Sequence, residues 1–225
     1  QARQEDAVRC LSLDDGAEIW RFSYPEKIKR NHGMSRTVPA VTDRYVVALG
    51  PLGRVHCLDM ETGSPVWAMD LVGDFGASVP PWYTGQCPLI DGDRVILAPG
   101  GTPLMMAVDL ATGRIVWRTS NPGGWGMTHS SIIAVGAGGE RQYVYCATRG
   151  VVGVSAADGR LLWKKPDWKI AMANVPTPLD IGDGRVLLTG GYNAGAAMIR
   201  IRPDGPPEDI FRIPPSVFGS DQQTP

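Results

Sequence analysis

A segment that ends in tryptophan recurs four times along the chain at nearly constant spacing. The tryptophans lie 47, 50 and 46 residues apart. The four copies, which align without gaps, are CLSLDDGAEIW (Cys10–Trp20), CLDMETGSPVW (Cys57–Trp67), AVDLATGRIVW (Ala107–Trp117) and GVSAADGRLLW (Gly153–Trp163). A weaker fifth copy, IRIRPDGPPEDIF, has Gly205 in the glycine place and Phe211 in the aromatic place. A period of about 40 to 50 residues is typical of the blade of a propeller.

The chemistry of each copy predicts a β-hairpin. Thr-Gly or Asp-Gly between two apolar runs supplies the positive φ of a tight turn, so the tryptophan falls on the returning strand. The turn glycines are Gly16, Gly63, Gly113 and Gly159. Upstream of each full copy lies a second pair of apolar runs separated by turn residues, such as QCPLI and RVILAPG on either side of DGD. One period therefore predicts a four-stranded antiparallel meander.

These meanders predict an all-β fold, a β-propeller of four-stranded antiparallel blades with about 4.5 blades present. A single blade has two apolar faces, so it needs stacked neighbours to bury them. We expect one propeller domain over residues 1–225, with blades at about 8–22 (half), 36–69, 85–119, 128–165 and 175–213, and the tail SVFGSDQQTP starting another. The four tryptophans would be wedges between blades, and burying each removes roughly 200 Å² from water, which is worth several kcal/mol at about 25 cal/mol per Å².

The pattern small-x-Asp/Ser-x-x-Thr/Asp-Gly-x-x-apolar-Trp resembles the tryptophan-docking repeat of propellers of the pyrroloquinoline quinone (PQQ) type. That family includes quinoprotein alcohol dehydrogenases and the BamB-like propeller lipoprotein of outer-membrane-protein assembly. Relatives usually have seven or eight blades, so the resemblance implies that about three blades of a longer chain complete the ring. Self-association of two arcs is the alternative. The resemblance also implies a periplasmic or cell-envelope location.

The composition excludes several classes of partner. With 22 Lys and Arg against 23 Asp and Glu, the net charge is −1, which argues against a nucleic-acid partner, a disordered tail and a polybasic membrane anchor. No apolar run approaches the roughly 20 residues of a membrane helix, so we predict no membrane span in this chain.

The four cysteines have no zinc or thioredoxin-type spacing, and we predict no metal site. Free thiols and disulfides are both compatible with the sequence. The cysteines are Cys10, Cys57, Cys87 and Cys146.

Strand order places the loops between second and third strands, and those joining one blade to the next, on one face of the propeller. We call it the loop face; the turn glycines lie on the opposite hairpin face. The run EKIKRNHGMSR is locally basic, which fits either an anionic partner or a solvated loop. Aromatic residues in PPWYTG and NPGGWGMTH fit either binding hot spots or loop packing. The candidate interaction residues are Arg30, His32, Arg36, Trp82, Tyr83, Trp125, His129, Asn174, Tyr192 and Asn193.

The function predicted from these features is a non-catalytic scaffold that binds a protein partner and holds no cofactor. The alternative is a fragment of a quinoprotein dehydrogenase, an oxidoreductase that needs PQQ and calcium. The adjacent cysteine pair of those enzymes is absent from the sequence. Four aspartates lie at predicted hairpin turns on the hairpin face and are interpreted as turn formers: Asp91, Asp93, Asp180 and Asp183. We therefore predict no catalytic residue.

Overall fold

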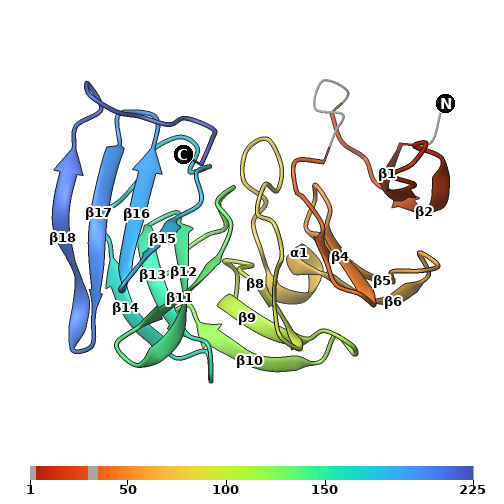
Figure 1. Ribbon diagram of the computed structural model, residues 1–225, viewed down its shortest axis with the longest axis horizontal. Coiled ribbons are helices and arrows are strands. Elements are labelled where there is room, and N and C mark those ends of the chain that lie inside the picture. Colours follow the sequence, from red (N-terminus) through yellow and green to blue (C-terminus); the bar gives the residue numbers. More distant parts are fainter. Residues whose placement is uncertain (1–3, 30–34, 225) are drawn as a thin grey trace.

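The computed structural model describes residues 4–29 and 35–224, which form antiparallel sheets arranged side by side in an arc (Figure 1). Four of these sheets have four strands and one has two. In every four-stranded sheet the strands are hydrogen-bonded in chain order, as a meander requires. The prediction of an all-β fold built from four-stranded antiparallel blades is confirmed.

The half blade comprises β1 (Glu5–Leu11) and β2 (Glu18–Pro25). The second blade comprises β3 (Ala40–Val41), β4 (Tyr45–Leu49), β5 (Arg54–Asp59) and β6 (Pro65–Asp70). The third blade comprises β7 (Leu89–Asp91), β8 (Arg94–Leu97), β9 (Pro103–Asp109) and β10 (Ile115–Ser120). The fourth blade comprises β11 (Ile133–Ala137), β12 (Glu140–Ala147), β13 (Gly150–Ser155) and β14 (Leu161–Lys165). The fifth blade comprises β15 (Leu179–Gly182), β16 (Arg185–Gly190), β17 (Gly195–Arg202) and β18 (Gly205–Ile213).

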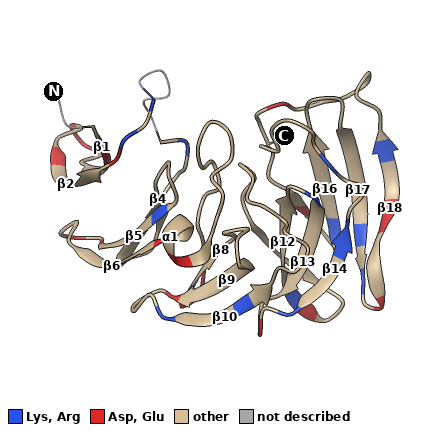
Figure 2. Cartoon of the chain, turned by 180° about the vertical axis from the view of Figure 1, so that it is seen from behind, with Lys and Arg blue, Asp and Glu red and all other residues tan. Residues whose placement is uncertain are grey.

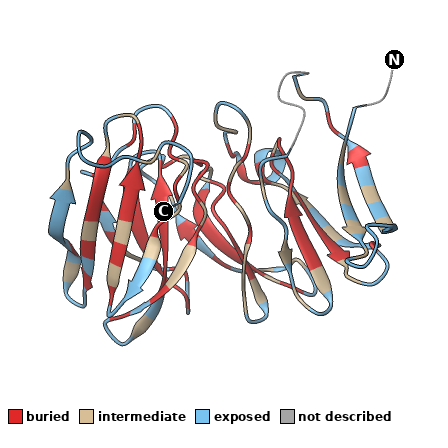
Figure 3. Cartoon of the chain, turned by 45° about the horizontal axis from the view of Figure 1, so that its top comes forward, coloured by how far each residue is buried: buried red, intermediate tan, exposed pale blue. Residues whose placement is uncertain are grey.

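The central strands of the blades form the core. Every residue of β13 is buried, and its sequence GVVGVS is apolar on both faces because a blade lies against each face. The last strand of the fifth blade, β18, is mostly exposed, and Figure 3 shows this change from buried to exposed strands. One cluster of buried side chains joins the third and fourth blades, with Ile96 packed in the same core as Tyr145. The stacking of blades thus buries the apolar faces that a single blade leaves open.

Repeat tryptophans lie against the turn glycine of the following blade at three junctions. At the third junction Trp117 donates its Nε1 hydrogen to the Ala156 carbonyl oxygen at 3.3 Å, and its ring covers Gly159. A Cβ atom at Gly159 would overlap that ring, and φ there is +75°. The same arrangement recurs for Trp20 with Met60 and Gly63, and for Trp67 with Leu110 and Gly113. The glycine therefore allows the turn and, because it has no side chain, also allows the indole ring to pack directly on the main chain.

The fourth tryptophan does not follow this pattern. The ring of Trp163 lies over Gly153 in its own blade, and its Nε1 donates to Gln142 Oε1 at 2.7 Å. In the next blade Gly205 lacks a positive φ, and a Cβ there would meet no atom within 4 Å. Gly205 pairs with Arg202 across a shorter turn, which offers no equivalent surface on which an indole ring could pack. The weaker fifth copy is a hairpin, but it does not receive the tryptophan before it.

A short helix lies between the second and third blades, where the sequence predicts only a loop. Helix α1 (Leu71–Phe75) begins where the Asp70 side chain accepts hydrogen bonds from the N–H groups of Val72 and Gly73, each at 3.0 Å. It ends at Gly76, which has a left-handed φ of +66°. The two buried residues of this helix pack in the core between the second and third blades.

The tail after β18 forms no strand over residues 214–224, so the expectation that it starts another blade is wrong for this described part. Its first two residues are prolines, which cannot donate ladder hydrogen bonds. The tail instead folds back over the loop face of the fifth blade. Asp221 Oδ1 accepts a hydrogen bond from the Tyr192 N–H at 3.2 Å, and Thr224 Oγ1 accepts one from the Thr177 N–H at 3.0 Å.

Asp91 at the end of β7 links the third blade to the fourth. Its carboxylate accepts hydrogen bonds from the Arg141 guanidinium at 2.7 and 2.9 Å and from the Tyr143 hydroxyl at 2.8 Å. The interpretation of Asp91 as a turn former misses this role, because both partners are about 50 positions away in the sequence.

We expect Asp91→Asn to lower the free energy of unfolding by about 1–2 kcal/mol at neutral pH. The hydrogen bonds from Arg141 hold the pKa of Asp91 below its ordinary value. The stabilisation is therefore present above the ordinary pKa of about 3.9 and is lost as the pH falls through the lower folded-state pKa. Urea unfolding at a series of pH values should show the difference from wild type closing only below about pH 4. Asp93→Asn is the control, since that carboxylate is 88% exposed; an equal loss there would contradict the assignment.

Candidate functional site

A cavity of about 520 Å³ lies on the loop face, where the loops of the second to fifth blades converge. We call it the loop-face pocket. Four of the candidate interaction residues line it, although they come from distant parts of the sequence: Arg36, Trp82, His129 and Tyr192. The structure therefore brings together residues that the sequence could assign only to a common face.

His129 connects the loops of three blades beneath this pocket. Its Nε2 lies 2.7 Å from the Pro81 carbonyl oxygen, so that nitrogen carries the hydrogen and donates it. Its main-chain N–H donates to the Asn174 carbonyl oxygen at 3.1 Å. Burial lowers the pKa of His129, and the Arg36 guanidinium lowers it further, while the hydrogen bond to Pro81 opposes both. A neutral imidazole with a fixed tautomer therefore fits a positioning role better than that of a cation.

Trp82 projects from the loop before the third blade and is 45% exposed. Its main-chain φ is +65°, a conformation that costs a bulky L-residue about 1–2 kcal/mol. The Arg36 guanidinium, which comes from a different loop, donates to the Trp82 carbonyl oxygen and so stabilises this conformation. Tyr192, which also lines the pocket, likewise has a positive φ, of +52°. Strained aromatic residues facing one cavity point to a binding surface, since strain is concentrated at functional sites.

A buried hydrogen-bond network of Gln86, Ala98, Tyr145 and Thr128, which we call the Gln86 network, lies next to the residues that line the pocket. Gln86 is fully buried; its Oε1 accepts from the Ala98 N–H at 2.9 Å, and its Nε2 donates to the Ala98 carbonyl oxygen at 3.2 Å. The same Nε2 is 3.2 Å from the Tyr145 hydroxyl, which also accepts a hydrogen bond from the Thr128 N–H at 2.8 Å. These bonds fix the residues next to Gly85 and His129, which line the pocket.

The other candidate residues lie elsewhere. Trp125 is only 7% exposed and packs in the core between the third and fourth blades, so its interpretation as an exposed hot spot is wrong and loop packing explains it. The Asn121 side chain accepts from the Trp125 N–H at 2.9 Å and turns the ring inward. Asn174 is buried beside the pocket, whereas Asn193 is exposed. Tyr83 lines a neighbouring groove. Arg30 and His32 lie outside the described residues.

Sequence reasoning missed five residues that line the pocket: Gly85, Met172, Ala173, Val175 and Gln222. Gly85 lets the His129 ring approach, since a Cβ there would lie 2.9 Å from the His129 Cβ. No residue pattern marks Met172, which is 60% exposed. The tail folds back and brings Gln222 to the pocket. The sequence does not predict this contact, because the tail was expected to start another blade.

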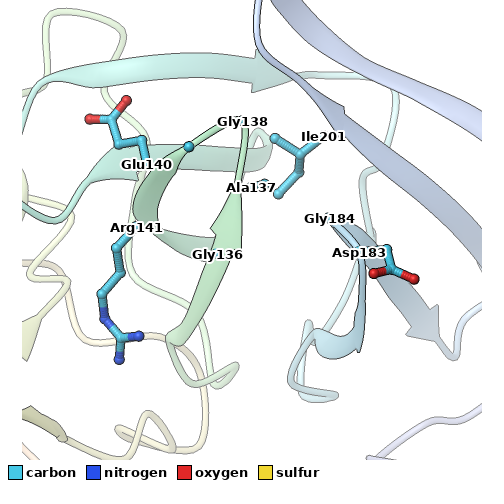
Figure 4. Close-up of a pocket in the computed structure, with 9 residues that line it drawn as sticks. Gly136, Ala137, Gly138, Glu140, Arg141, Asp183, Gly184 and Ile201 are labelled. Carbon is cyan, nitrogen blue, oxygen red and sulfur yellow. The ribbon is translucent and has the colours of Figure 1, made fainter.

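A second cavity of about 480 Å³ lies on the hairpin face between the fourth and fifth blades, among glycine turns (Figure 4). Glu140 and Asp183 lie on different sides of it, and Arg141 points away from both. These three side chains are already in ion pairs: Glu140 with Arg160, Asp183 with Arg185 and Arg141 with Asp91. The loop-face pocket, whose Arg36 has no ion pair with a described residue, is the better candidate for binding.

Within residues 4–29 and 35–224, no three His, Cys, Asp or Glu side chains are grouped closely enough to hold a metal ion. No helix in this part of the chain has the length and apolar character of a membrane-crossing segment.

Comparison with known proteins places this architecture among PQQ-like propellers. The structure is similar to that of BamB from Moraxella catarrhalis, with a TM-score of 0.63 and 20% sequence identity over 92% of this chain and 55% of that one. It is also similar to quinohemoprotein alcohol dehydrogenase from Comamonas testosteroni, with a TM-score of 0.54 and 14% identity over 86% of this chain and 37% of that one. A europium-containing methanol dehydrogenase gives a TM-score of 0.53 and 16% identity over 86% of this chain and 43% of that one.

The chain thus spans about half the length of the BamB structure and less of the two dehydrogenases. At these identities the likeness shows the fold alone. No curated protein sequence matches the chain. The family model described as outer membrane protein assembly factor BamB matches residues 4–205. Because this match covers most of the sequence, the chain belongs to that PQQ-like propeller family.

Proposed function

We propose that this chain is part of a non-catalytic propeller that binds a protein partner through its loop face in the cell envelope, without a cofactor. The rest of the ring would come from further blades or from a second copy. The observation that carries the proposal is the loop-face pocket, where exposed Trp82 and Met172 stand beside the cationic Arg36. Aromatic, methionine and arginine side chains are those enriched at protein interfaces.

Site-specific crosslinking in intact cells tests the scaffold role. A photoreactive amino acid at position 82 should give a discrete adduct with an envelope protein. The control position is Glu61, an exposed turn residue on the hairpin face, which should give none. Equal adducts at both positions, or none at position 82, would overturn the proposal.

A ligand experiment tests the absence of a cofactor. Adding PQQ and calcium to the protein should leave the thermal unfolding midpoint unchanged. A ligand that binds the native state stabilises it by about 2.7 kcal/mol at one hundred times its Kd. A saturable rise of the midpoint that requires both additions would favour the quinoprotein dehydrogenase instead.

A further inference from the structure

We propose that the loop-face pocket and the groove beside it bind one extended, acidic segment of a partner protein that passes over Trp82. This inference rests on the proposed scaffold function and specifies the chemistry of the partner. It is carried by the shape of the surface on either side of Trp82, by its charge and by the way its backbone is held.

Trp82 separates two depressions. One is the loop-face pocket, and the other is a groove of about 510 Å³ in which apolar residues predominate: Leu52, Val79, Pro80, Pro81 and Tyr83, with Lys29 also lining it. Trp82 lines both depressions. Side chains on the same side of an extended chain are about 7 Å apart, so such a segment can place one side chain on each side of an indole.

Each depression carries its own cation. Arg36 lines the pocket and Lys29 lines the groove, and neither has an ion pair with any described residue. Figure 2 shows basic residues on both sides of the segment that is drawn in grey between β2 and β3. By contrast the neighbouring Arg54 is 3.8 Å from the Glu26 carboxylate. Two cations, one in a mainly apolar groove and one in a pocket of mixed polar and apolar residues, fit a segment that combines carboxylates with apolar side chains.

Hydrogen bonds to the main chain and from it hold the groove in shape. The Thr84 N–H donates to the Pro51 carbonyl oxygen at 3.1 Å, and its hydroxyl donates to the Gly50 carbonyl oxygen at 2.7 Å. The Lys29 N–H donates to the Tyr83 hydroxyl at 2.8 Å, which holds the Lys29 main chain beside the groove. A surface held in this way loses little conformational entropy on binding.

The test uses a fluorescein-labelled peptide of alternating glutamate and phenylalanine, and a matched peptide with lysine in place of glutamate. Fluorescence polarisation should show binding of the acidic peptide alone, and that binding should weaken as salt is raised. Arg36→Glu and Trp82→Ala should each weaken it by at least about tenfold. The control is Arg114→Glu, which makes the same charge change at an exposed residue beyond the Gly113 turn on the hairpin face and should leave the affinity unchanged.

Equal binding of the basic peptide, or an equal loss in Arg36→Glu and Arg114→Glu, would overturn the inference, as would acidic-peptide binding that survives Trp82→Ala. The Arg36 guanidinium also donates to the Trp82 carbonyl oxygen, so Arg36→Gln, which keeps a side-chain N–H donor and removes the charge, separates the two roles. Arg36→Gln should weaken acidic-peptide binding at the wild-type unfolding midpoint, so that the loss of binding is not a loss of fold. An adduct at position 82 without acidic-peptide binding would retain the scaffold proposal and remove the acidic partner. If neither is seen, both proposals fail.

Discussion

Gly159→Ala is expected to lower the free energy of unfolding by about 3 kcal/mol or more. Alanine at a φ of +75° costs about 1–2 kcal/mol by itself. The new methyl group would also overlap the Trp117 ring, which is 8% exposed and has little room to move. Displacing the ring breaks its hydrogen bond to the Ala156 carbonyl oxygen and opens the junction between the third and fourth blades. Urea unfolding measures the change.

Gly16→Ala is the matched control for that experiment. Gly16 has nearly the same φ, +73°, in the same repeat turn, but no atom lies within 4 Å of its Cβ position. Its alanine variant therefore measures the backbone strain alone. The difference in free energy of unfolding between the two variants measures the cost of displacing the indole ring. Equal losses in the two variants would show that the tryptophan contributes nothing beyond turn geometry.

The blades were predictable because turn and strand signals are local. Thr-Gly or Asp-Gly turns and alternating apolar runs act within about ten residues, and repetition makes each copy a check on the others. Where the local signal was incomplete the prediction failed. Gly205 has the glycine of the repeat but not its φ, because the turn there is shorter, and Trp163 therefore lies over Gly153 instead.

The site was less predictable because it depends on contacts between distant segments. Strand order could place Trp82, His129 and Tyr192 on one face, and the structure brings them to one cavity. Strand order could not distinguish exposed Trp82 from buried Trp125, since both lie in loops between blades, Trp82 after two prolines and Trp125 after Pro-Gly-Gly. The difference comes from Asn121, whose side chain fixes the Trp125 loop inward. No local pattern contains that information.

Gln86→Met is expected to lower the free energy of unfolding by about 2–4 kcal/mol, because the substitution keeps the approximate shape of the side chain and removes its hydrogen bonds. The Ala98 N–H and carbonyl groups would lose these partners in a site from which water is excluded, since Gln86 and Ala98 are both fully buried. Gln222→Met, at an exposed residue of the tail, is the control for the change in chemistry and should cost little.

The same substitution separates support of the pocket from direct contact with a ligand. Gln86 does not line the loop-face pocket, but it is adjacent to Gly85, which does, and it contacts Tyr145, which holds the residue before His129. We therefore expect Gln86→Met to weaken acidic-peptide binding without changing its dependence on salt, because Arg36 still supplies the charge. If the affinity for the acidic peptide is unchanged while the free energy of unfolding falls, the Gln86 network stabilises the fold and does not position the pocket.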